Sequence, residues 1–208
     1  MGLKNFLVNF FKGTENNERK PETIKENNDI KIINLLTNEA NQGDKNAQYK
    51  LGNYYDSGLK IEQNYNEAFK WYKKAAEQGH IDAQYNLGIY YKNGYGIEQN
   101  YNEAFKWLEK ATEQGHIDAQ SELEETQYYL GLYYEQKGNY LEAFKWFEKI
   151  AEKGHRNAQY HLGLLYFVGK HYIKTFEHNS QGINYDKKNL LNGLKKRLIK
   201  DKEMLNFI

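Results

Sequence analysis

Histidines are the residues of this sequence whose type and spacing could do chemistry. His80, His116 and His155 each follow a glycine and recur at intervals of 36 and 39 residues. A neutral imidazole can bind a metal ion or act as a general base. A shared zinc ion would need its nitrogen ligands at about 2 Å, whereas neighbouring helices pack about 8–10 Å apart. We therefore interpret these histidines as residues of turns between repeats.

The sequence shows few other side chains or motifs that could support catalysis. Glu124 and Glu125 are adjacent, so on a helix they point apart and form no acid/base pair. The chain has no cysteine, which excludes thiolate nucleophiles, thiolate metal ligands and disulfides. The sequence contains no phosphate-binding glycine loop, no Gly-x-Ser-x-Gly and no HExxH motif. We predict a protein that is not an enzyme and that has no cofactor or metal.

Long stretches of the sequence occur twice, and they define the repeat units that position these histidines. IEQNYNEAFKW at 61–71 returns unchanged at 97–107. Repetition at a fixed period of 20–50 residues is typical of a solenoid. The expected units are 47–82, 83–118 and 119–157, followed by a partial unit at 158–169.

Each unit carries the start and stop signals of two helices. Asparagine and aspartate are good N-cap residues, and glycine favours the left-handed conformation that ends a helix. A glutamate three residues after each second cap resembles a capping box. The first helices are predicted to begin after Asn46, Asp82, Asp118 and Asn157, and the second after Asn64, Asn100 and Asn139 and to end at Gly79, Gly115 and Gly154.

Glycines inside the first helices predict close packing of the second helices. A glycine at mid-helix costs about 1 kcal/mol relative to alanine, so a neighbouring helix is expected to approach it closely. The third unit departs from the others, with seven extra residues before its Leu-Gly pair and four fewer between its helices. The mid-helix glycines are Gly52, Gly88, Gly131 and Gly163, and the expected partners of the first three are Ala68, Ala104 and Ala143.

The pattern AQYxLGxYY…G…NYxEAFKWYxKAAEQGH resembles the Sel-1-like repeat, a relative of the tetratricopeptide repeat. The resemblance covers roughly residues 30–170. It implies an all-α fold, a right-handed α-solenoid of stacked antiparallel helix pairs. It also implies a scaffold or adaptor that binds other proteins.

By analogy with tetratricopeptide packing, the first helices line a concave groove. A tyrosine stands two residues before each Leu-Gly leucine, and the stripe continues one residue after each glycine and one turn later. Tyrosine gives contact area and a polar tip at low entropic cost, which suits a binding surface. The alternative is that these tyrosines only pack between helices. The predicted partner-binding residues are Tyr49, Asn53, Tyr85, Ile89, Lys92, Tyr128, Leu132, Glu135, Tyr160, Leu164 and Phe167.

The two ends of the chain are predicted to differ from the repeat domain at 29–208. An amphipathic segment at 1–12 precedes a polar linker at 13–28, and a basic, leucine-striped helix at about 185–206 is expected to cap the solenoid. Residues 2–12 could dock on a membrane, a partner or the solenoid itself.

The predicted function is a protein-binding scaffold whose partner is another protein or a peptide. The net charge of +1 gives no overall field for nucleic acid. The absence of a recognisable signal peptide, an apolar span and cysteine predicts a cytoplasmic protein. Alternatives are an immunity or regulatory protein that blocks an effector, and a membrane-tethered scaffold. An enzyme is a further class, and it would need a cluster of titratable groups in the groove.

Overall fold

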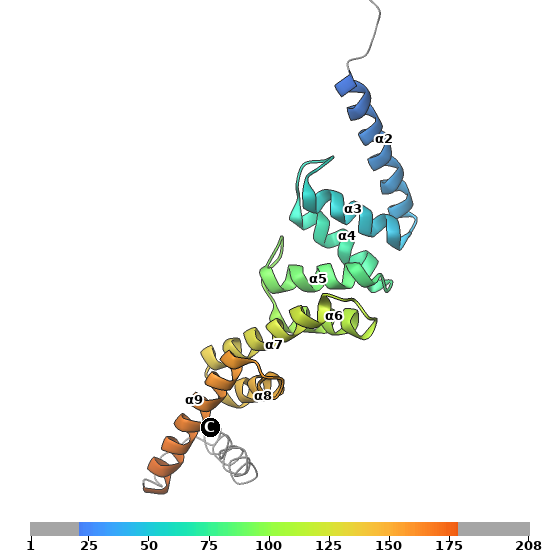
Figure 1. Cartoon of the computed structure of the whole chain (residues 1–208). Helices are drawn as coiled ribbons and strands as arrows, with labels where there is room; N and C mark the ends of the chain where they lie inside the picture. The colour runs from blue at the N-terminus through green and yellow to red at the C-terminus, as the bar shows by residue number, and fades with distance from the viewer. Residues whose placement is uncertain (1–20, 179–208) are drawn as a thin grey trace, which may run out of the picture.

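The computed structural model describes the backbone of residues 21–178 and the side chains of residues 29–167. Within residues 21–178 every element of regular structure is a helix, so the predicted all-α class is confirmed (Figure 1). The helices are α2 (Pro21–Asn41), α3 (Lys45–Ser57), α4 (Tyr65–Glu77), α5 (Ile81–Asn93), α6 (Tyr101–Glu113), α7 (Ala119–Gln136), α8 (Tyr140–Ala151) and α9 (Arg156–His178).

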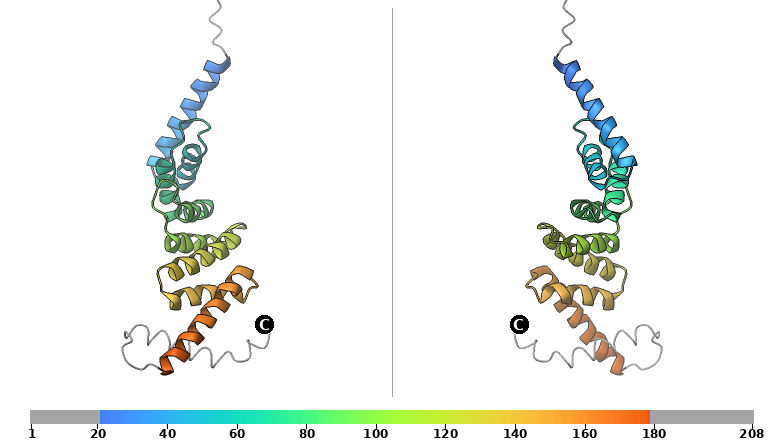
Figure 2. Two further views of the ribbon diagram at one scale, coloured as in Figure 1. Left: turned by 90° about the vertical axis from the view of Figure 1, so that its left-hand side faces the viewer. Right: turned by 90° about the vertical axis from the view of Figure 1, so that its right-hand side faces the viewer.

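The helices form a solenoid of stacked pairs. Helices α3 and α4, α5 and α6, and α7 and α8 pack as pairs, and each pair packs on the next. Figures 1 and 2 show the pairs stacked along one line, with α2 at one end and α9 at the other. Almost every contact between helices is therefore made by neighbours along the chain, as expected of a repeat architecture.

Three of the four mid-helix glycines are sites of close helix packing, but the predicted partners were wrong. A Cβ atom added to Gly52 would lie 2.6 Å from the Tyr72 ring, and one on Gly88 would lie 2.6 Å from Leu108. Gly131 faces the Phe147 ring in the same way. The contacting side chain comes four residues after the predicted alanine, because the large residue needs the space that glycine leaves. The alanines Ala68, Ala104 and Ala143 are themselves fully buried.

Most first helices begin earlier than the sequence predicted. Asp44 caps α3 by accepting a hydrogen bond from the Ala47 N–H at 2.8 Å. His80 caps α5, and its Nδ1 accepts from the Ala83 N–H at 3.3 Å. The predicted caps Asn46, Asp82 and Asn157 lie inside the first turns, since a residue two positions earlier already accepts the orphan N–H. Asp118 is the N-cap position of α7, as predicted, but its side chain makes no capping bond.

The second helices begin where the sequence predicted, with half of the capping box. Helices α4 and α6 end two residues before the predicted glycines, whereas α8 ends at Ala151, three residues before Gly154. The side chains of Asn64, Asn100 and Asn139 accept hydrogen bonds from the N–H groups of the glutamates three residues on. The reciprocal bond is missing, because each asparagine N–H donates instead to a carbonyl of the preceding helix, as Asn64 does to Tyr55 at 2.8 Å. The terminal glycines Gly79, Gly115 and Gly154 all have positive φ.

The third repeat shows both predicted departures, one of them smaller than expected. Helix α7 has 18 residues against 13 in α3 and α5. It is longer by five residues rather than seven because it begins at Ala119, whereas the equivalent Ala83 is the third residue of α5. Three residues join α7 to α8, against seven between α3 and α4, which confirms the tight turn.

The ends of the described chain differ from the predicted boundaries. Helix α2 begins at Pro21, so residues 21–28 are helical rather than part of a linker. Proline is favoured in the first turn of a helix, where its missing N–H costs nothing. Helix α9 continues to His178, beyond the partial repeat expected to end at residue 169. The segment 1–12, residues 13–20 of the linker and the helix expected at 185–206 lie outside the described residues.

Candidate protein-interaction surface

Three of the four predicted groove tyrosines stack on the histidine at the start of the next repeat. The ring centroids of Tyr49 and His80 are 4.3 Å apart, and those of Tyr85 and His116 are 4.2 Å apart. Tyr128 lies 4.9 Å from His155 in a more tilted arrangement. These tyrosines are half-buried, and each joins one repeat to the next.

The histidines are structural in this arrangement. Nδ1 of His80 and Nδ1 of His155 accept hydrogen bonds from the N–H groups of Ala83 and Ala158, at 3.3 and 3.2 Å. An accepting nitrogen carries no proton, so the cap requires the neutral ring. Burial lowers the pKa of His80, which favours that form. Among residues 29–167, no three potential ligand side chains gather in a way that could hold a metal ion.

Asn53 of the predicted groove stripe and Asp56, which continues the stripe near the end of α3, join neighbouring helices. Asn53 accepts a hydrogen bond from the Tyr72 hydroxyl at 2.7 Å, and Asp56 accepts one from the Tyr90 hydroxyl at 2.5 Å. Burial, and for Tyr90 also the bond to Asp56, raises the pKa of both phenols well above the usual value. Both therefore act as neutral donors inside the stack.

Lys92 is the most buried charge of this stripe. Its Nζ lies 2.5 Å from Glu122 Oε2 and 2.6 Å from Glu125 Oε2. Burial acts to lower the pKa of Lys92, but the two carboxylates outweigh it and raise the pKa above its usual value. Both glutamates belong to the first turns of the lengthened α7, so the insertion in the third repeat supplies the partners of a lysine in the second.

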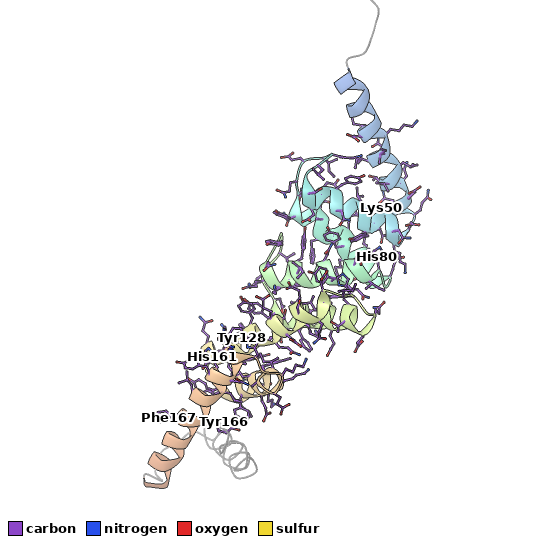
Figure 3. All side chains as sticks on the ribbon, in the orientation of Figure 1. Lys50, His80, Tyr128, His161, Tyr166 and Phe167 are labelled. Atoms are coloured by element: carbon purple, nitrogen blue, oxygen red, sulfur yellow. The ribbon has the colours of Figure 1, made fainter. Side chains whose placement is uncertain are left out.

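At the C-terminal end of the stripe the surface becomes apolar and open. Glu135 Oε2 lies 2.9 Å from His161 Nδ1. Figure 3 shows His161 beside Tyr128, where α7 meets α9. Phe167 lies farther along α9, toward the end of the stack (Figure 3). Tyr160 is 64% exposed and Phe167 71%, which is far above the other residues of the stripe.

A pocket with a volume of about 590 Å³ opens beside this end. We call it the C-terminal pocket. Four of its six lining residues are apolar or aromatic, and two are polar. Concave, mostly apolar surfaces with a few polar groups are typical of binding sites. The lining residues are Leu132, Glu135, Gln136, Tyr140, Leu164 and Leu165.

Apart from Tyr160 and Phe167, which are exposed outside the pocket, the structure divides the predicted partner-binding residues into two groups. The N-terminal group is engaged in contacts between helices, or is half-buried in the case of Ile89. Leu132, Glu135 and Leu164 line the C-terminal pocket. The sequence did not single out Gln136, Tyr140 and Leu165, although the shortened loop of the third repeat was a signal, because it brings the start of α8 next to the end of α7.

These features define a class: an α-solenoid built from repeated helix pairs, with its open surface at one end. The model of the Sel1 repeat family matches residues 45–80, 81–116, 125–155 and 156–175, and the chain belongs to this family. Sel1 repeats generally mediate protein–protein interactions, and proteins of the family are typically non-catalytic scaffolds. Among the described residues no helix is long and apolar enough to cross a membrane.

Solved structures of the same family resemble parts of the chain. A Sel1 repeat protein from Oxalobacter formigenes is 41% identical over 60% of this chain and 49% of its own, with a TM-score of 0.37. A protective antigen of uropathogenic Escherichia coli with an SLR fold is 35% identical over 64% of this chain and 28% of its own, with a TM-score of 0.41.

A third solved structure, the cysteine-rich protein B of Helicobacter pylori, is 27% identical over 44% of this chain and 68% of its own, with a TM-score of 0.42. The chain therefore spans about half, or less, of the length of the first two relatives. A comparison with curated proteins gave no match.

Proposed function

We propose that this chain is a non-catalytic scaffold that holds an apolar segment of another protein in the C-terminal pocket. The observation that carries the proposal is the contrast along the stripe. Its N-terminal residues are held by Tyr72, Tyr90 and the glutamates of α7, whereas Leu132 and Leu164 face an open pocket. Among the described residues of the stripe, the most exposed apolar surface therefore lies at the C-terminal end.

The chemistry of the pocket suits a short amphipathic partner segment. Three leucines and Tyr140 supply apolar and aromatic contact area, and aromatic side chains are enriched where interfaces concentrate binding energy. Glu135 and Gln136 give polar groups at the rim, which fix orientation more than they add affinity. Glu135 adds negative charge, so a segment with a basic residue beside its apolar anchor fits best.

Site-specific photo-crosslinking tests this proposal. A benzoylphenylalanine placed at Leu164 reports proteins that touch the pocket in the cell that makes the chain. The control is the same residue at Ile117, which is 92% exposed and lies in the loop between α6 and α7. We expect protein adducts from position 164 that are absent from position 117, in variants whose circular dichroism matches the wild type. Adducts from both positions alike, or from neither, would overturn the proposal.

A further inference from the structure

Among the described residues, nothing covers the outer face of α9, whereas the equivalent face of each earlier first helix is covered. Tyr160, Gly163 and Phe167 are spaced three and four residues apart, so they share one face of α9. Gly52, Gly88 and Gly131 each meet a large side chain of their own second helix, but no described atom lies within 4 Å of a Cβ placed on Gly163. We call these three residues of α9 the open face.

The aromatic contacts of this face show the same gap. Tyr85 and Tyr128 stack on a histidine of the following repeat, whereas Tyr160 contacts only His161 of its own helix among the described rings. Two exposed aromatic side chains, Tyr160 and Phe167, therefore flank an exposed glycine. Such a face in a repeat protein is a place for a further helix.

The sequence after α9 carries the Asn-Tyr pair at which every earlier second helix begins, with Lys187 where those helices have a glutamate. Helices α4, α6 and α8 each begin at the tyrosine of an Asn-Tyr pair, with the asparagine as N-cap. The same pair occurs at Asn184–Tyr185, six residues after the end of α9 at His178, and also at Asn53–Tyr54, where it lies inside α3. A stripe of leucines follows at helical spacing: Leu191, Leu194, Leu198 and Leu205.

The three complete repeats give a rule for which residues meet. In each repeat the mid-helix glycine lies five residues before the end of the first helix. Its partner lies seven residues after the tyrosine that starts the second helix. The pairs are Gly52 with Tyr72, Gly88 with Leu108, and Gly131 with Phe147.

The rule can be extended to α9 because an antiparallel hairpin keeps the two counts in step. In the complete repeats the glycine lies five residues before the end of the first helix, and its partner lies seven residues after the first residue of the second helix. The second distance is thus two residues longer than the first. Phe167 lies 11 residues before His178, the end of α9. Its partner is therefore expected 13 residues after Tyr185, at Leu198. The same procedure applied to Tyr160 leads to Leu205. Both exposed aromatic residues are thus matched with leucines of the same stripe.

We propose that residues 184–206 form the second helix of a fourth repeat and cover the open face of α9 in the same chain. The segment is tethered close to the face, which gives a local concentration of roughly millimolar. A second copy of the chain would have to compete with it. The pairing leaves Lys196, Arg197 and Lys200 off the leucine stripe, facing solvent, and the same count places Lys202 opposite Gly163. This proposal concerns the open face, and the C-terminal pocket can be tested separately.

Engineered disulfides test the pairing, and the natural chain offers a clean background because it has no cysteine. The test pair is Phe167→Cys with Leu198→Cys, and a second pair is Tyr160→Cys with Leu205→Cys. The matched control is Phe167→Cys with Lys196→Cys, because Lys196 lies about 200° around a helix from Leu198. Under mild oxidation we expect an intramolecular disulfide in both test pairs, formed at least about ten times faster than in the control.

The outcomes separate this proposal from its rivals. Disulfide-linked dimers in place of the internal cross-link would assign the open face to a second copy. Equal rates in test and control pairs, or no cross-link at all, would also overturn the proposal. A second measurement uses the full chain with Leu198→Asp and Leu205→Asp: amide exchange in residues 158–167 is expected to accelerate about tenfold or more, and unchanged exchange would count against the pairing.

Discussion

Tyr85 stacks on His116 with their ring centroids 4.2 Å apart and their planes 13° from parallel. The two residues belong to successive repeats, so the contact ties the first helix of one repeat to the turn that begins the next. Its equivalents at Tyr49 and Tyr128 make the tyrosine ladder a set of contacts between repeats. A tyrosine that recurs at this position therefore contributes to stability even where no partner binds.

Replacing Tyr85 should destabilise the solenoid. We expect Tyr85→Ala to lower the free energy of unfolding by about 2 kcal/mol, since it removes a half-buried ring and an aromatic pair worth about 1 kcal/mol. Tyr85→Phe keeps the stacked ring and should cost less than about 0.5 kcal/mol. Urea unfolding followed by circular dichroism measures both, with Ile117→Ala as the exposed control. Equal losses for the alanine and phenylalanine variants would show that the ring contact is not the source.

Lys92 should contribute more to stability than a surface lysine does. We expect Lys92→Met to lower the free energy of unfolding by about 1–2 kcal/mol, because it leaves Glu122 and Glu125 without their cation. The control Lys106→Met removes an exposed pair with Glu103 and should cost less than about 0.5 kcal/mol. Adding Glu122→Gln to Lys92→Met should recover part of the loss. Additive losses would argue against a coupled pair.

The sequence predicted the repeat architecture well because its signals are local and occur several times. The asparagine caps of the second helices and their terminal glycines lie within a few residues of the groups they serve. Two N-caps of the first helices were predicted wrongly for different reasons. Asn46 lies two residues after Asp44, an equally good cap by residue type, and Asp82 is a better cap by residue type than His80, which caps α5. The position of His80 is fixed by the repeat before it, through its stacking on Tyr49.

The candidate site was harder to predict from the sequence than the fold, because it depends on how the helices pack. A stripe drawn along the first helices cannot show that Asn53 and Asp56 are engaged by tyrosines of other helices. Nor can it show that Tyr140, from a second helix, joins Leu132 at the pocket. The periodicity of a helix identifies which residues share a face, and only the neighbouring helices decide which part of the face stays open.

The glycine at the helix crossing should tolerate no side chain unless its partner is reduced. A Cβ on Gly88 would lie 2.6 Å from Leu108 Cγ and 3.3 Å from the Leu108 backbone nitrogen. We expect Gly88→Ala to lower the free energy of unfolding by about 1–3 kcal/mol through overpacking. The double variant Gly88→Ala with Leu108→Ala should be less destabilised than the sum of the two single variants. Thermal or urea unfolding measures this coupling, and strict additivity would place the two residues out of contact.

Acid should weaken the cap at His80. The folded-state pKa of His80 is lowered by burial, so the unfolded chain takes up a proton at this residue first as the pH falls. The stabilisation is fully present above the unfolded pKa of about 6.5 and is lost as the pH falls from there toward the folded pKa. The cap bond from Ala83 agrees with this sign, because protonation of Nδ1 would replace an acceptor by a donor.

The variant His80→Asn isolates this titration. Asparagine can accept the same N–H without titrating near pH 6, so its free energy of unfolding should fall less between pH 7.5 and 5.5 than that of the wild type. We expect the fall in the free energy of unfolding over this pH range to differ between the two proteins by a few tenths of a kcal/mol, because the ring is only partly shielded from water. The lost stacking on Tyr49 lowers stability at every pH alike, so the two slopes are compared rather than the absolute values. Parallel curves for the two proteins would show that protonation of His80 does not reach the cap.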